Sequence, residues 1–330
     1  MFDRTVLIAA ACAVLLAGCG KSGPEQPART RVGIVAKSLG NGFFDAVHRG
    51  ADEAGRELDA EVIFVGPTTP TAEGQIETLN SLIAQRVDAI AVSANDPDAL
   101  VPTLKKALDR GIKVVSYDSA VAPGGRNAHL APSSDPLIGE TVVALTAELA
   151  PDGKGKFAVV SATPTSTNQN AWLAEMRKAL AAHPGLDMVS VAYGDDVSDK
   201  SYREAVALLQ QHPDLDVLVS ISSVGIVASA RAVQDQGLAG KVKVTGLGLP
   251  SELAGYVQSG VVPKFAIWNP IDLGYSTMQI ATRLARGGDL TKPVPTGRMG
   301  EVTFGADGVG AMSKPFIYDA ANVAEFAKIF

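Results

Sequence analysis

Short apolar runs alternate with amphipathic stretches along almost the whole chain, and this alternation constrains the fold more than any other feature. The run at 31–37 is followed by the stretch 43–58, in which apolar residues recur at helical spacing. About ten such units follow one another, which is more than the eight of a (β/α)₈ barrel. The runs lack the polar alternation of half-exposed strands, so they predict parallel sheets covered by helices. We expect an α/β fold of two doubly wound parallel-sheet lobes, with the barrel as the alternative.

Three local patterns give more detailed expectations. Asp96-Pro97 is expected to cap and begin a helix that runs to Arg110. Ser201 and Glu204 have the spacing of a capping box in a helix near 199–211. From about Thr291 onward we expect an irregular tail with one strand near 301–304.

Composition narrows the class of protein. The chain has 330 residues, 46% of them hydrophobic and 19% charged, so it can bury a large core and is expected to be folded. Its net charge is -6, without basic clusters, which argues against nucleic-acid binding. No metal-ligand spacing, CxxC motif or Walker A motif occurs, so no metal and no cofactor is expected.

The N-terminal segment ends in Leu16-Ala17-Gly18-Cys19, which closes the apolar run Val6 to Leu16. That run falls short of the roughly 18 residues that span a bilayer. The tetrapeptide resembles the lipobox of bacterial lipoproteins. The resemblance implies a signal peptide over 1–18, lipidation at Cys19, and a cell-envelope or periplasmic location. Residues 19–30 have the Gly- and Pro-rich composition of a flexible tether.

Two alternatives for this segment are a plain secretory signal and an uncleaved anchor helix. Only two cysteines occur in the chain, and Cys12 lies in the segment that would be removed. We therefore expect the mature protein to have no disulfide.

Polar and aromatic side chains gather where the predicted strands end. Lys37, Asp118 and Gln169 each follow an apolar run, while Phe43 and Trp268 bring aromatic rings to the same positions. In open parallel sheets, ligands bind beyond the carboxyl ends of the strands. Such polar groups suit the hydroxyls of a neutral polyol, and aromatic faces suit its C–H patches.

Several segments resemble type I periplasmic sugar-binding proteins of ABC importers, in the branch of rhamnose-binding and autoinducer-2-binding proteins. They are Lys37–Phe44, Ser93–Leu100, Thr167–Trp172, Thr245–Pro250 and Phe265–Pro270. The resemblance covers nearly all of 31–330. It implies two lobes joined by three strands, with the ligand in the cleft between them. We expect residues 31–120 and 268–297 to form the first lobe, and 121–267 and 298–330 the second. The hinges are expected near 119–126, 267–271 and 296–300.

The resemblance also implies which residues contact the ligand. They are Lys37, Asn41, Phe43, Phe44, Asp118, Asn168, Gln169, Ser222, Ser223, Gly248, Trp268 and Asn269. Autoinducer-2 binders have Asp where this chain has Asn168 and Pro where it has Ile221, so rhamnose or a close 6-deoxyhexose is the first expectation. Autoinducer-2 and other monosaccharides are the alternatives. Ser222-Ser223 also suits a helix N-cap. Trp172, which lies in the segment Thr167–Trp172, suits the core rather than the ligand site.

The function expected from these observations is a non-catalytic one. The chain would capture a monosaccharide and deliver it to an ABC permease as a monomer, with the lipid at Cys19 as its membrane contact. One alternative is a sensor that presents the sugar to a receptor. Another class is a barrel aldolase or lyase with Lys37 as Schiff-base residue, and a third is the ligand core of a cytoplasmic repressor.

Overall fold

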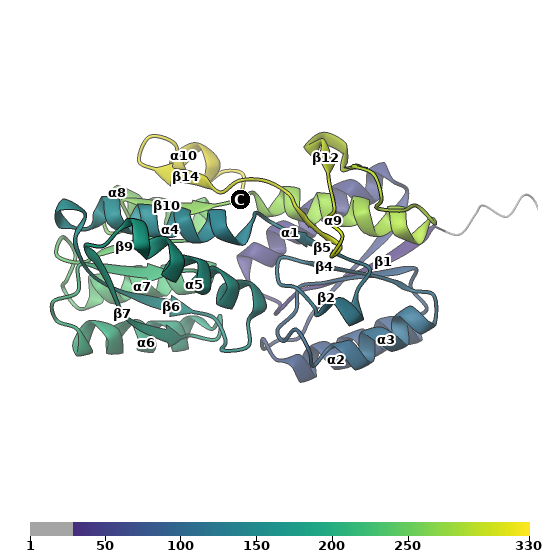
Figure 1. Ribbon diagram of the computed structural model, residues 1–330, viewed down its shortest axis with the longest axis horizontal. Coiled ribbons are helices and arrows are strands. Elements are labelled where there is room, and N and C mark those ends of the chain that lie inside the picture. The colour runs from purple at the N-terminus through teal and green to yellow at the C-terminus, as the bar shows by residue number, and fades with distance from the viewer. Residues whose placement is uncertain (1–28) are drawn as a thin grey trace, which may run out of the picture.

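The computed structural model describes residues 29–330, which fold into two α/β lobes side by side (Figure 1). The first lobe is built on a six-stranded parallel sheet in the order β13-β5-β4-β3-β1-β2. Its strands are β1 (Thr30–Val35), β2 (Ala60–Val65), β3 (Ala89–Val92), β4 (Lys113–Tyr117), β5 (Ala128–Ala131) and β13 (Val309–Ala311). The expected parallel sheet is confirmed, and the barrel alternative is wrong.

Helices cover both faces of the first sheet because its strands are apolar on both sides. Two helices pack together on one face: α1 (Gly42–Glu57) and α9 (Pro270–Ala285). The opposite face is covered by α2 (Ala72–Ala84) and α3 (Val101–Asp109), whose Leu79 and Leu104 are fully buried.

The second lobe has a four-stranded parallel sheet in the order β7-β6-β8-β9, extended by an antiparallel pair of strands. Its strands are β6 (Gly155–Ser161), β7 (Leu186–Tyr193), β8 (Val217–Ser220), β9 (Lys243–Gly246), β10 (Lys264–Ile267) and β14 (Phe316–Asp319). A bridge between Leu247 and Ala266 places β10 beside β9. The helices are α4 (Asp135–Leu149), α5 (Thr167–Ala179), α6 (Ser198–Gln211), α7 (Ser223–Asp235), α8 (Pro250–Gln258) and α10 (Val323–Phe326).

Two strands lie in a different sheet from the one expected. β5 and β13 were expected in the second lobe, but β5 pairs with β4 and β13 pairs with β5 in the first sheet. The chain therefore passes between the two sheets at 132–134, 268–269 and 312–315. Ser313 N–H donates to the Pro132 carbonyl at 3.0 Å, so two of these crossing segments lie against each other.

Three local expectations are wrong. The helix after β3 begins at Val101, because the Asp96 carboxylate accepts from the N–H groups of Asp98 and Ala99 and closes a turn there. α6 begins at Ser198, so Ser201 lies inside it and donates to the Gly194 carbonyl instead of capping the helix. The tail is also more ordered than expected. It contains a short hairpin of β11 (Val294–Pro295) and β12 (Glu301–Val302), followed by β13, β14 and α10.

The expectations for the N-terminal segment, including Cys19, fall outside the described residues. Within 29–330, no helix has the length and apolar character required to cross a bilayer.

Candidate functional site

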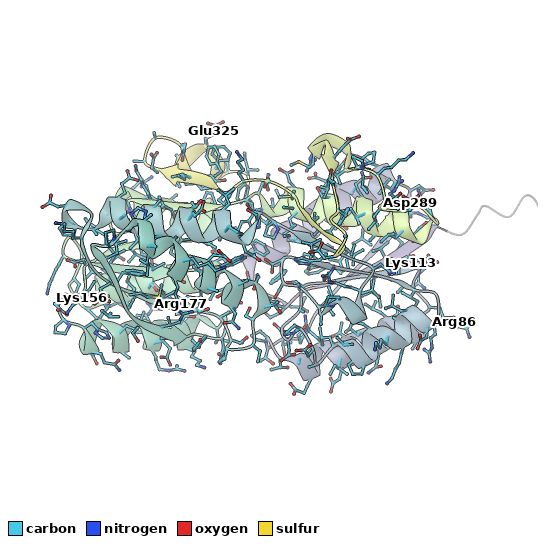
Figure 2. All side chains as sticks on the ribbon, viewed as in Figure 1. Arg86, Lys113, Lys156, Arg177, Asp289 and Glu325 are labelled. Atoms are coloured by element: carbon cyan, nitrogen blue, oxygen red, sulfur yellow. The ribbon has the colours of Figure 1, made fainter. Side chains whose placement is uncertain are left out.

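A cavity with about 390 Å³ of unoccupied space lies between the lobes, at the carboxyl ends of both parallel sheets. This is where doubly wound sheets bind ligands. Its walls come from both lobes, whose side chains meet between the two sheets (Figure 2). The lining residues are Lys37, Asn41, Phe43, Phe44, Asp118, Asn168, Gln169, Trp172, Asp196, Ile221, Ser222, Ser223, Leu247, Ile267 and Trp268.

The structure brings together all the sequence-predicted site residues except two. Gly248 packs against the side chains of Leu253 and Ile226, which leave no room for a Cβ atom, so its role there is close packing. Asn269 is the N-cap of α9, and its side-chain oxygen accepts from Ile271 N–H at 2.9 Å. The rest of the predicted set lines the cavity.

Lys37 and Asp118 stand at the ends of β1 and β4 and are both buried. The Lys37 ammonium reaches across the cleft and donates to Asn168 Oδ1 at 3.1 Å and to Ser166 Oγ at 2.8 Å. The Asp118 carboxylate accepts from Asn168 Nδ2 at 3.1 Å and from Ser93 Oγ at 2.8 Å. Asn168 therefore ties the second lobe to both charged groups of the first lobe.

The buried position of Asp118 disfavours the charged form of its carboxyl group. Burial raises the pKa of this carboxyl group above its ordinary value, while nearby Lys37 and the hydrogen bond from Ser93 work in the opposite direction. Its backbone is left-handed, with φ of 55°, which costs of order 1 kcal/mol even for Asp. Buried charge and backbone strain in one residue are typical of functional sites.

Gln169 follows Asn168 on the first turn of α5. Its side-chain oxygen accepts from Ser161 Oγ at 2.8 Å and from Ala162 N–H at 2.6 Å. These bonds fix the amide against the end of β6 and leave its Nε2 group without an acceptor among the described residues. The cavity thus gains a fixed hydrogen-bond donor from the second lobe.

Aromatic rings form one wall of the cavity. The Trp268 ring lies 6.2 Å from Phe43 and 5.5 Å from Trp172, centroid to centroid, in edge-to-face contacts. Phe43 and Phe44 both line the cavity, and Phe44 also packs against Tyr117. The Trp268 indole N–H is buried and has no hydrogen-bond partner among the described residues. An unpaired buried donor beside a cavity is the kind of group that a ligand satisfies.

Sequence reasoning missed several lining residues. Trp172 was placed in the core, where it does lie, but it also lines the cavity. Asp196 follows the end of β7 and is in the left-handed region, with φ of 53°.

Ser222 donates a hydrogen bond to the Asp196 carboxylate, and it also caps α7 by accepting from Gly225 N–H at 3.0 Å. The expected helix-capping role of Ser222 is confirmed, and its side chain also lies in the cavity lining. The available signal for Asp196 was its position after an apolar run. The apolar members of the lining, Ile221, Leu247 and Ile267, carry no such signal.

The arrangement is suited to holding a neutral, hydroxyl-rich molecule. One ammonium, two carboxylates, fixed amides and aromatic faces converge from two lobes, and such groups recognise hydroxyls and C–H patches. Within residues 29–330, no cluster of His, Cys, Asp and Glu side chains is placed to hold a metal ion.

Comparison with known proteins agrees with this geometry. The periplasmic binding protein domain family matches residues 32–289. A D-ribose/D-allose-binding protein of Pseudomonas aeruginosa is 32% identical over 252 residues, which cover 71% of this chain and 77% of that protein.

Solved structures extend the comparison. An ABC transporter solute-binding protein from Clostridium phytofermentas, with bound L-rhamnose, superposes with a TM-score of 0.87 at 33% identity, over 92% of this chain and 99% of that one. LsrB from Clostridium saccharobutylicum, in complex with AI-2, gives 0.85 at 22% identity, over 90% and 99%, which shows a shared fold. The chain therefore belongs to the periplasmic binding protein family, and its type I fold is that of the sugar-binding proteins of ABC transporters.

Proposed function

We propose that this protein captures a monosaccharide in the cleft between its lobes and delivers it to the permease of an ABC importer. The observation that carries the proposal is a cavity where charged and amide groups converge from both lobes, lined by Trp268, whose buried N–H has no partner among the described residues. A sugar supplies hydroxyl acceptors for such donors and hydroxyl donors for the Asp118 and Asp196 carboxylates.

The proposed ligand is rhamnose or a close 6-deoxyhexose. The rhamnose-bound structure, at 33% identity, supports this choice. The apolar lining of Ile221, Leu247 and Ile267 gives a methyl group an apolar contact surface, while a primary hydroxyl would lose a hydrogen bond to water there. Ribose and allose are the alternatives raised by the relative that is 32% identical. Autoinducer-2 is an alternative supported by a likeness of fold alone.

The ligand proposal is tested by titration with L-rhamnose, L-fucose, D-ribose, D-allose and AI-2, using calorimetry and intrinsic fluorescence. The chain has two tryptophans, and both line the cavity, so ligand binding is expected to change the emission. Saturation at 100 times the dissociation constant should stabilise the fold by about 2.7 kcal/mol. Ribose or allose binding more tightly than rhamnose would overturn the ligand assignment. No response to any sugar would overturn the function.

We also propose that a lipid on Cys19 anchors the protein at the cell envelope and keeps capture close to the permease. Lipidation is expected to add the mass of the acyl groups to an N-terminal peptide that begins at Cys19. The test is mass spectrometry of protein from a bacterial membrane fraction. Cys19→Ala should abolish the acylated peptide, and an unmodified N-terminus at another residue in the unchanged protein would contradict the anchor.

A further inference from the structure

Three consecutive hydroxyl residues, Thr165, Ser166 and Thr167, connect the second lobe to the first. Thr165 and Ser166 lie in the turn that follows β6, and Thr167 is the first residue of α5. Thr165 Oγ1 donates to the Asn95 carbonyl at 3.0 Å, and Thr167 Oγ1 donates to the Ala120 carbonyl at 3.0 Å. Ser166 Oγ accepts from Lys37 Nζ at 2.8 Å. Each hydroxyl is thus bonded to a segment that follows a different strand of the first sheet, β3, β4 or β1.

These hydroxyls do not belong to the cavity lining. Lys37 and Asn168 line the cavity, whereas residues 165–167 are not among its lining residues. Ser166 stands at the N-cap position of α5, where a serine hydroxyl ordinarily accepts from the helix backbone, but it makes no such bond here. Its hydroxyl instead donates to Asn168 Oδ1 at 3.1 Å. The Ser166 hydroxyl therefore bonds Lys37 of the first lobe and Asn168 of the second, and so contributes to the contact between the lobes.

We propose that Thr165, Ser166 and Thr167 form an interlobe latch, which sets sugar affinity by holding the closed arrangement of the lobes without touching the sugar. The expected effect on sugar affinity rests on the proposed function. The expected effect on the arrangement of the lobes does not, because it is measured without sugar. A site that binds ligand only when closed has its apparent affinity reduced by the fraction of molecules that are closed. Positioning residues of this kind change that fraction and leave the recognition of individual hydroxyls unchanged.

The latch predicts a uniform effect on affinity. A net hydrogen bond in a protein corresponds to about a 2- to 10-fold change in an equilibrium constant. Thr165→Val, Ser166→Ala and Thr167→Val should each weaken binding of every bound sugar by about that factor. For Thr165→Val and Thr167→Val, whose lost hydroxyls bond no cavity residue, the ratio of affinities between sugars should stay as in the unchanged protein. Thr165→Ser and Thr167→Ser retain the hydroxyl and should restore affinity.

The matched control is Thr141→Val. Thr141 Oγ1 donates to the Leu137 carbonyl at 2.6 Å within α4, so this change removes the same kind of bond inside a single lobe. It is expected to leave sugar affinity unchanged.

The conformational readout uses the full chain without any sugar. Small-angle scattering should show a larger radius of gyration for the combined Thr165→Val, Ser166→Ala and Thr167→Val variant than for the unchanged protein and the control. An unchanged radius would overturn the latch, even if the protein binds no sugar and the proposed function fails. Affinity losses of Thr165→Val or Thr167→Val that differ from sugar to sugar would also overturn it, because they would place these hydroxyls in contact with the ligand.

Discussion

Asp118 combines three properties that are rarely found in a residue with a purely structural role. It is buried, its backbone is left-handed, and burial raises its pKa against the opposing effects of Lys37 and Ser93. Since a raised pKa means that the fold disfavours the charged form, the carboxylate is not retained there for folding stability. Its contribution is instead expected in the bound state, where ligand hydroxyls donate to it.

Asp118→Asn is therefore expected to weaken sugar binding while leaving stability nearly unchanged. Charge-assisted hydrogen bonds contribute about 1.5–3 kcal/mol, so the loss should be at least about tenfold in affinity. Calorimetry measures the affinity and urea unfolding measures the stability. Asp98→Asn, an exposed carboxylate outside the cavity lining, is the control. Equal affinity in the Asp118 variant would remove this residue from the site.

The two tryptophans provide a second comparison at the residue scale. Trp172 Nε1 donates to Asp135 Oδ1 at 3.0 Å, whereas the Trp268 N–H has no partner among the described residues. Phenylalanine at position 172 would leave the partly buried Asp135 carboxyl group without that bond. Trp172→Phe should therefore lower the free energy of unfolding by about 1–3 kcal/mol more than Trp268→Phe. Trp268→Phe should weaken sugar binding, because the donor lost there is free for the ligand. Urea unfolding measures the stability of the two variants, and calorimetry measures their sugar affinity. A Trp268→Phe variant less stable than Trp172→Phe would contradict the structural role given to the Trp172 N–H.

At the scale of elements, the sequence predicted the long, strongly periodic units and assigned two short strands to the wrong sheet. β1 and α1 were expected nearly at their observed bounds, because their apolar residues follow one period without interruption. β5 and β13 are short, and they pair with each other although they lie far apart in the chain. Nothing local in such a strand determines which sheet it joins, since pairing depends on the path of the whole chain.

His129 on β5 makes a pH dependence measurable. Burial, and the nearby Arg126, lower its pKa to about 4, and its Nδ1 lies 3.0 Å from Ser116 Oγ. An unfolded histidine takes up a proton near pH 6.5, while the folded one stays neutral until about pH 4. The unfolded state thus binds more protons in that window, so stability is present above about pH 6.5 and is lost as the pH falls toward 4.

The loss should reach about 3 kcal/mol at pH 4. Urea unfolding across this range measures it, and His129→Gln should reduce the slope. Other acidic groups titrate in the same range, so the difference between the variant and the unchanged protein isolates the histidine. His48→Gln is the control, because His48 lies on a part of α1 that is not buried. This variant should keep the original slope. Equal slopes in both variants would show that His129 does not determine this dependence.

At the scale of the whole molecule, the sequence predicted the two lobes and placed the cleft at the ends of the strands. It did so because parallel sheets bring all their carboxyl ends to one edge, whatever the side chains are. The direct hydrogen bonds between the lobes could not be predicted this way. Lys37 and Ser166 are far apart in the chain, and their contact depends on how the lobes face each other. Asp196 was missed although it follows an apolar run. Its place in the cavity lining depends on the turn after β7 and matches no sequence motif.

The two lobes are also connected through their cores, which leads to a prediction for unfolding. One continuous cluster of buried apolar residues includes Val115 of the first sheet and Val159 of the second, and the chain crosses between the sheets three times. We therefore expect the lobes to unfold together. Both tryptophans lie at the junction, so their fluorescence reports the interface, while far-ultraviolet circular dichroism reports the helices of both lobes. The two signals should give coincident urea transitions, because a two-state change gives the same midpoint with every probe. Added sugar should move both midpoints by the same amount. A fluorescence transition that precedes the loss of helix would instead mean that the lobes separate before either one unfolds.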